Sequence, residues 1–148
     1  MPRPALHDRL TWRLSRVARI MQSQLESRLA QEGLTRMTWL VLTGLGEDGI
    51  ATPSDLAAHI GITRPATSRL LARMEASGHV TRRLAGHDAR SVTLTLTDLG
   101  HAVLDRTRPD VYAHLARYRA KLDPAAYASL MDALARLAEG EDDRLSTL

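Results

Sequence analysis

The spacing of apolar residues changes from a helical to an alternating period at Gly78, and this change restricts the fold more than any other feature of the sequence. Before it, two short helical patterns cover residues 53–60 and 63–76, with a glycine turn between them. After it, apolar and polar residues alternate over residues 80–84 and 92–96, as in the two strands of a hairpin. The sequence therefore predicts a helix-turn-helix followed directly by a β-hairpin.

Helical patterns flank this segment on both sides. A long amphipathic helix is expected at about residues 6–30, and a buried second helix begins at Thr35 and ends in a glycine-rich turn. After the hairpin we expect a helix at about residues 97–122 that bends at Pro109, and a last helix at about residues 123–137. The expected fold class is mainly α (α+β).

The charge of the chain points to a nucleic-acid partner. The net charge is only +3 over 148 residues, a length that suits one domain. Residues 52–95, however, carry six Arg against Asp55, Glu75 and Asp88, which is +3 for this segment alone. All basic residues except Lys121 are arginine, whose forked guanidinium group suits phosphates and guanine edges. An arginine-rich genome composition is the alternative explanation.

Several classes of protein are excluded or disfavoured. The absence of cysteine excludes disulfides, a thiol nucleophile and a thiol-based sensor. No apolar run approaches the roughly 20 residues that span a bilayer, and the N-terminus does not resemble a secretion signal, so we expect a cytoplasmic protein with no membrane partner. The six histidines form no i, i+4 pair, which disfavours a metal site. No catalytic set and no cofactor motif can be named, so we do not expect an enzyme.

The helix at residues 63–76 has two different faces. Its inward face carries apolar residues and one threonine, namely Thr67, Leu70, Leu71 and Met74. The opposite face carries Arg64, Ser68, Arg69, Ala72 and Arg73. An exposed row of arginines and a serine is what a helix needs to read a DNA groove.

The order of these elements, and three motifs within them, resemble the MarR family of winged-helix transcription regulators over nearly the whole chain. The motifs are Pro53-Ser54-Asp55-Leu56-Ala57, the stretch from Thr63 to Gly78, and Asp88-Ala89-Arg90-Ser91 followed by Leu96-Thr97-Asp98-Leu99-Gly100. One departure is Ala89, where relatives commonly have a second arginine. The resemblance implies one MarR-like domain over residues 1–148, with a DNA-binding lobe at 35–97 and dimerisation helices at 6–31 and 98–138.

In a winged helix-turn-helix, the charged residues of the second helix and of the hairpin are expected to contact different parts of the DNA. Arg64, Ser68 and Arg69 are expected in the major groove, and Arg73 on phosphate. Arg90 is expected in the minor groove, where Asp88 would orient it. The full set of DNA-binding candidates is Arg64, Pro65, Thr67, Ser68, Arg69, Arg73, Arg82, Asp88 and Arg90. For Arg69, Arg73, Arg82 and Arg83, a solvated surface position is the alternative.

One recognition helix covers too few base pairs for useful specificity, so we expect a homodimer on a pseudo-palindromic site of double-stranded DNA. The first and last helices and the segment after Pro109 have more apolar surface than one small lobe can bury. The family resemblance also implies a small-molecule effector that releases the DNA, and it favours a repressor.

Two places are candidates for a small aromatic or anionic effector. Trp12, Arg16 and Arg19 share one face of the first helix. Cation–π packing or ion pairing between subunits is the alternative role of these three residues. Trp39 is the second candidate, with a core position as its alternative. A winged-helix module that binds another protein, without specific DNA binding, is the competing function for the whole chain.

Overall fold

This computed structural model describes residues 5–84 and 92–141. Capping side chains fix where most of its helices begin. In each case, a hydroxyl or carboxylate before the helix accepts a backbone N–H from the first turn. The caps are Thr35 for α2 (Arg36–Gly46), Thr52 for α3 (Pro53–Ile60), Thr63 for α4 (Arg64–Ala76), Thr97 for α5 (Asp98–Arg119) and Asp123 for α6 (Pro124–Ala138). All five starts agree with the predicted boundaries.

The predicted start of the first helix is wrong by one turn. Residues Leu6–Asp8 form a separate 3₁₀ turn, η1, and the α-helix α1 covers Leu10–Gln31. Between them Arg9 is extended, with φ −77° and ψ 133°, and no side chain caps the helix. The apolar spacing runs from Leu6 into α1, but an extended residue interrupts the helical backbone, which periodicity alone cannot reveal.

Helices α2 to α4 and the hairpin form one lobe. Strand β1 (Val80–Leu84) pairs antiparallel with β2 (Val92–Leu96), and Val80 lies opposite Leu96. The alternation predicted from the sequence is present at the end of β2, where Leu94 and Leu96 are buried and Thr95 is exposed. In β1 only Val80 is buried, and Leu84, predicted on the same face, is 66% exposed because the strand extends beyond the core. Gly61 joins α3 to α4 in the left-handed conformation, at φ 78°, which glycine adopts without steric cost.

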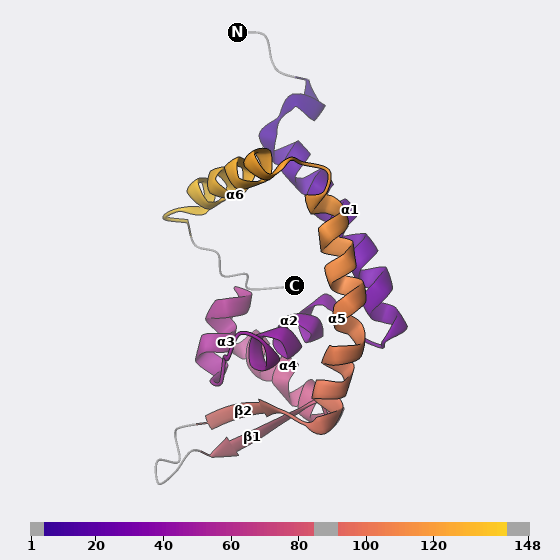
Figure 1. Cartoon of the computed structure of the whole chain (residues 1–148). Helices are drawn as coiled ribbons and strands as arrows, with labels where there is room; N and C mark the ends of the chain where they lie inside the picture. Colours follow the sequence, from indigo (N-terminus) through magenta and orange to yellow (C-terminus); the bar gives the residue numbers. More distant parts are fainter. Residues whose placement is uncertain (1–4, 85–91, 142–148) are drawn as a thin grey trace.

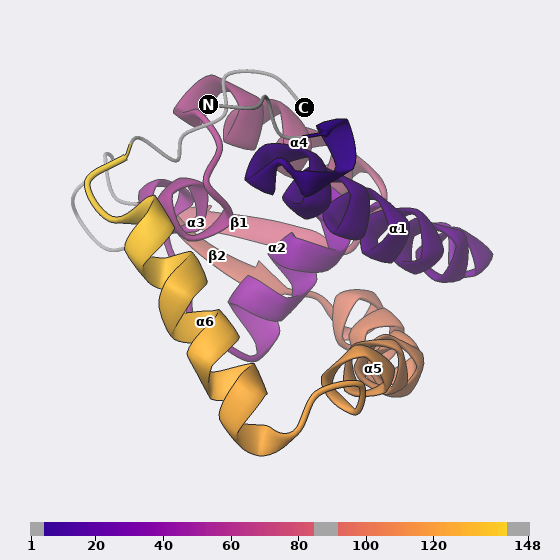
Figure 2. The same ribbon diagram turned by 90° about the horizontal axis from the view of Figure 1, so that it is seen from above.

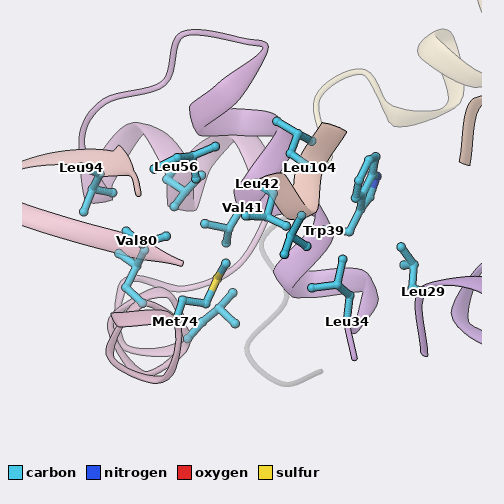
Figure 3. Packing of buried hydrophobic residues seen from close by; sticks show 14 of the residues in the cluster. Leu29, Leu34, Trp39, Val41, Leu42, Leu56, Met74, Val80, Leu94 and Leu104 are labelled. Atoms are coloured by element: carbon cyan, nitrogen blue, oxygen red, sulfur yellow. The ribbon is translucent and has the colours of Figure 1, made fainter. Parts of the chain in front are cut away.

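The core of the lobe is continuous with the packing of α5 and α1. Figure 3 shows Val41 and Leu42 of α2 surrounded by side chains from the neighbouring helices and both strands. The cluster also includes Leu104 of α5 and Leu29 of α1. Trp39 is 5% exposed and belongs to this core, as the alternative prediction for it stated.

The long helices α1 and α5 carry the chain away from the lobe. Figure 1 shows the hairpin at one end of the molecule, and the start of α1 and the end of α5 at the opposite end. Helix α5 remains continuous across Pro109. Within the described residues, no helix combines the length and the apolar character needed to cross a membrane.

Helix α6 stands apart from the rest of the chain. Figure 2 shows it separated from α1, and none of its residues is buried. Large apolar side chains on α1 and α6 are 36% to 55% exposed: Leu10, Leu14, Val17 and Ile20, and Leu130, Met131, Leu134 and Leu137. Apolar surface of this extent on two helices is typical of an interface with another chain.

Candidate nucleic-acid interface

The exposed face of α4 collects cations that have no carboxylate partner among the described residues. Arg64, Ser68, Arg69 and Arg73 are all exposed, whereas Leu70, Leu71 and Met74 of the same helix are buried. In residues 5–84 and 92–141, no ion pair or hydrogen bond involves the guanidinium group of Arg64, Arg69 or Arg73. These three donors are therefore available to an anionic partner.

Thr67 does not lie on this surface, which corrects its place among the DNA-binding candidates. It is 1% exposed, and its hydroxyl donates to the carbonyl of Thr63 at 3.0 Å. Its position in the helix, three residues before Leu70, turns it toward the core. Pro65 is exposed at the first turn of α4 and lies beside the arginine face.

The sequence did not reveal a hollow of about 600 Å³ between α4 and the start of α2. Arg69 and Arg73 of α4, with Ser77 just after it, line one side, and Thr38 of α2, with its cap Thr35, lines the other. The two threonines were recognisable only as helix-capping residues, which is a role they also have. The structure thus places hydroxyl groups beside two of the predicted DNA-binding arginines.

Arg82 connects the hairpin to α4. Its Nε lies 2.7 Å from a carboxylate oxygen of Glu75, and its Nη2 donates to the carbonyl of Ser68 at 3.3 Å. A DNA contact by Arg82, one of the predicted candidates, would compete with this ion pair, whereas Arg83 is exposed. Asp88 and Arg90, the other candidates on the hairpin, lie outside the described residues.

A second polar cluster joins the end of α2 to α5. Glu47 accepts from Arg108 Nε at 2.5 Å and from the phenol of Tyr112 at 2.6 Å. The hydrogen bond to this carboxylate, and then desolvation, raise the pKa of Tyr112 above its usual value. On the opposite side of α5, Arg106 pairs with Glu32 at 2.6 Å. Helix α5 is therefore tied to the lobe and to α1 by separate carboxylates.

The predicted ligand-binding residues lie in two different places. Trp39 lines a hollow of about 350 Å³ between α1, α2 and α5, together with Arg36 and His114. Trp12, Arg16 and Arg19 instead line a hollow of about 540 Å³ on α1. There the Arg16 guanidinium carbon lies 5.4 Å from the centre of the Trp12 ring, as the cation–π alternative stated.

His114 lines the same hollow as Trp39, and the sequence analysis did not single it out. It is 2% exposed, and its Nε2 donates to the carbonyl of Met21 at 3.1 Å when that nitrogen carries the proton. Its Nδ1 is buried without a hydrogen-bond partner in the described part of the chain. In the sequence, no neighbouring residue distinguishes His114 from the other histidines. Only the packing of α5 against α1 gives its ring a hydrogen-bond partner. We call the hollow formed by Arg36, Trp39 and His114 the inner pocket.

Comparison with known proteins gives consistent results. A sequence model of the MarR family matches residues 32–91. The chain is 30% identical over 113 residues to the HTH-type transcriptional repressor Rv2887 of Mycobacterium tuberculosis, a match that covers 76% of this chain and 81% of that protein.

Two solved structures have a similar fold. Sco3205, a MarR family transcriptional regulator from Streptomyces coelicolor in complex with DNA, has a TM-score of 0.82 at 28% identity, covering 95% of this chain and 91% of that one. NadR in complex with 4-hydroxyphenylacetate has a TM-score of 0.75 at 28% identity, covering 95% of this chain and 100% of that one. The matched relatives are regulators of transcription rather than enzymes.

Proposed function

This chain belongs to the MarR family of transcriptional regulators, and from that premise we propose that it is a ligand-responsive repressor that binds a pseudo-palindromic duplex as a homodimer. In this proposal, residues 35–97 form the DNA-binding lobe, and residues 6–31 and 98–138 form the dimerisation region. The observation that carries the proposal is the row of exposed arginines on α4, which have no carboxylate partner in the part of the chain that the structure describes. The repressor Rv2887 and the DNA-bound regulator Sco3205 support it.

The residues of α4 have different roles in this proposal. Arg64, at the first position of the helix, and Arg69 would contact base edges in the major groove, with Ser68 between them. Arg73 lies one turn beyond Arg69 and would contact phosphate. Arg82 would act through Glu75, by holding the hairpin against α4, rather than through DNA.

Salt titration of DNA binding distinguishes base contacts from phosphate contacts. Operator duplexes are first selected from a random pool, and affinity is then measured against salt concentration. Arg73→Ala is expected to reduce the log–log salt slope by about one, with similar effects on all duplexes. Arg64→Ala is expected to cost about 1–3 kcal/mol on the selected duplex and to relax the preference for one base pair.

Arg13→Ala is the matched control, because Arg13 is exposed on α1 and pairs with Asp8. It should leave both the slope and the preference unchanged. Equal affinity of the parent protein for selected and scrambled duplexes would instead favour the winged-helix module that binds another protein.

We assign the effector to the inner pocket and expect an aromatic acid that carries a hydroxyl group. Arg36 supplies a cation for the carboxylate, and Trp39 supplies an aromatic wall. A neutral His114 that donates from Nε2 to Met21 has an acceptor at Nδ1, which suits a phenolic hydroxyl. The complex of NadR with 4-hydroxyphenylacetate, at 28% identity, supports this class of ligand.

Binding of 4-hydroxyphenylacetate tests this assignment. The ligand should raise the melting temperature and weaken DNA binding, because it stabilises a conformation that fits DNA less well. Phenylacetate, which lacks the hydroxyl, should bind about tenfold more weakly, and Arg36→Gln should weaken the hydroxylated ligand by a similar factor. Arg16→Gln is the control. If Arg16→Gln abolished the response and Arg36→Gln did not, the effector would belong on α1 instead.

A further inference from the structure

The start of α2, residues 35–40, lies between two hollows. Figure 2 shows α2 itself between α4 and α5. Arg36 and Trp39 line the inner pocket, and their i, i+3 spacing places them on one face of the helix. Met37 and Thr38 occupy other positions around the same turn and line the hollow beside α4. The start of α2 therefore separates the proposed effector pocket from the DNA-binding helix.

Space and hydrogen bonding allow the start of α2 to shift toward α4. The hollow beside α4 has a volume of about 600 Å³, and none of its lining residues belongs to the proposed dimerisation region. In the described part of the chain, the hydroxyls of Thr35 and Thr38 bond only within their own turn, where Thr38 donates to Thr35 O at 2.9 Å. A shift of α2 would therefore break no hydrogen bond from these hydroxyls to α4.

The other end of α2 is fixed to α5. Glu47, just after the helix, accepts from Arg108 Nε at 2.5 Å and from the Tyr112 hydroxyl at 2.6 Å. Leu42, in the second half of the helix, is fully buried in the core. Attachment at one end and space at the other are the conditions under which a rigid helix can pivot.

We propose that α2 transmits effector binding to the DNA-binding helix by pivoting about Glu47. This inference rests on the proposed function, which places the effector in the inner pocket. A ligand in that pocket presses on Trp39 and Leu40, and it favours a conformation in which the start of α2 enters the hollow beside α4. Arg69 and Arg73 line this hollow, so the shift displaces two of the arginines that the proposed function assigns to DNA.

The effect of a ligand on DNA affinity measures this relay. DNA binding of the full chain is titrated with and without saturating 4-hydroxyphenylacetate, and we expect the ligand to weaken the DNA affinity of the parent about tenfold or more. Ala66 is half-buried and lines the hollow beside α4, so Ala66→Leu fills part of the space. In this variant the ligand should weaken DNA binding by about twofold or less. The control Ala66→Ser leaves the space nearly unchanged and should respond like the parent.

A substitution at Glu47 tests the pivot. Glu47→Gln removes the charge that holds Arg108, so the end of α2 can yield and the effect of the ligand on DNA affinity should fall to about threefold or less. Glu32→Gln is the matched control, because Glu32 pairs with Arg106 of α5 at 2.6 Å but follows α1 rather than α2. It should keep the response of the parent.

A third variant tests the relay without any ligand. Leu40→Trp enlarges a side chain that lines the inner pocket, so it should itself weaken DNA binding about tenfold. The double variant Leu40→Trp/Ala66→Leu should regain most of this affinity, because the filled hollow keeps α2 in place. If 4-hydroxyphenylacetate neither binds the parent nor releases DNA, the assigned effector is wrong, and these two variants decide the relay separately.

Three results would overturn the proposal. A full ligand effect in Ala66→Leu would show that α2 does not enter the hollow. Equal losses in Glu47→Gln and Glu32→Gln would show that any loosening of α5 has the same effect. Unrestored DNA binding in Leu40→Trp/Ala66→Leu would mean that the inner pocket acts on DNA by another route. Far-UV circular dichroism of all variants confirms that they remain folded.

Discussion

Gly100→Ala is expected to destabilise the fold by about 3 kcal/mol or more, because there is no space for a side chain at this position. A Cβ atom on Gly100 would overlap the carbonyl oxygen of His79 and would lie 3.3 Å from the Cβ of Leu96. The overlap is with backbone, so a change of rotamer cannot relieve it. Either the first turn of α5 or the start of β1 would have to move.

Hydrogen bonds at this junction limit such movement. The backbone N–H of Thr97 donates to His79 O at 3.1 Å, and the Thr97 hydroxyl donates to Gly78 O at 2.5 Å. Both bonds hold the start of α5 against the turn between α4 and β1. The substitution therefore disturbs the connection between the DNA-binding lobe and the helix that leaves it.

Urea denaturation followed by circular dichroism measures the effect. Gly33→Ala is the matched control, since Gly33 has φ +69° and a Cβ atom added to it would have no neighbour within 4 Å. It should cost only about 1 kcal/mol, because a residue with a side chain is strained in the left-handed backbone conformation. Similar midpoints for the two variants would show that the junction at Gly100 is not tightly packed.

Leu130→Asp/Leu134→Asp is expected to produce a monomer that binds selected DNA about 10³-fold more weakly. The two leucines lie one turn apart on α6 and are 43% and 36% exposed in the single chain. In the proposed dimer, they would be buried against the second copy, where a carboxylate is costly. A monomer reads only half of a pseudo-palindromic site, so it loses most of the specific binding energy.

Analytical ultracentrifugation and DNA titration measure these two consequences separately. Ala125→Asp/Ser129→Asp is the control, because it adds the same charges one turn apart on the other face of the same helix. It should remain a dimer with nearly unchanged DNA affinity. A dimer that persisted in Leu130→Asp/Leu134→Asp would show that α6 does not form the interface.

Local signals were sufficient to predict most of the elements. Thr35, Thr52, Thr63, Thr97 and Asp123 mark helix starts because a cap acts on the N–H groups immediately after it. The two faces of α4 were likewise readable from spacing alone. The extended Arg9 was not predictable, because nothing in the apolar pattern distinguishes it from a helical residue.

The parts of the site that the sequence did not reveal depend on long-range contacts. Arg82 appeared to be a surface cation, but it meets Glu75 only when the hairpin folds against α4. His114 gains a polar role only when α5 packs against Met21 of α1, which lies 93 residues away in the chain. Such pairings depend on tertiary structure, so one sequence gives the residue types without their partners.

Pro109 gives α5 a mechanical property that the other helices lack. A proline has no N–H, so the carbonyl of Asp105 has no helical donor at the point where α5 leaves the lobe. Within the turn that lacks this bond, Arg106 pairs with Glu32 and Arg108 with Glu47. These ion pairs hold the turn that lacks the bond to the residues just after α1 and α2, and dissolved ions weaken this attachment because the paired side chains are partly exposed.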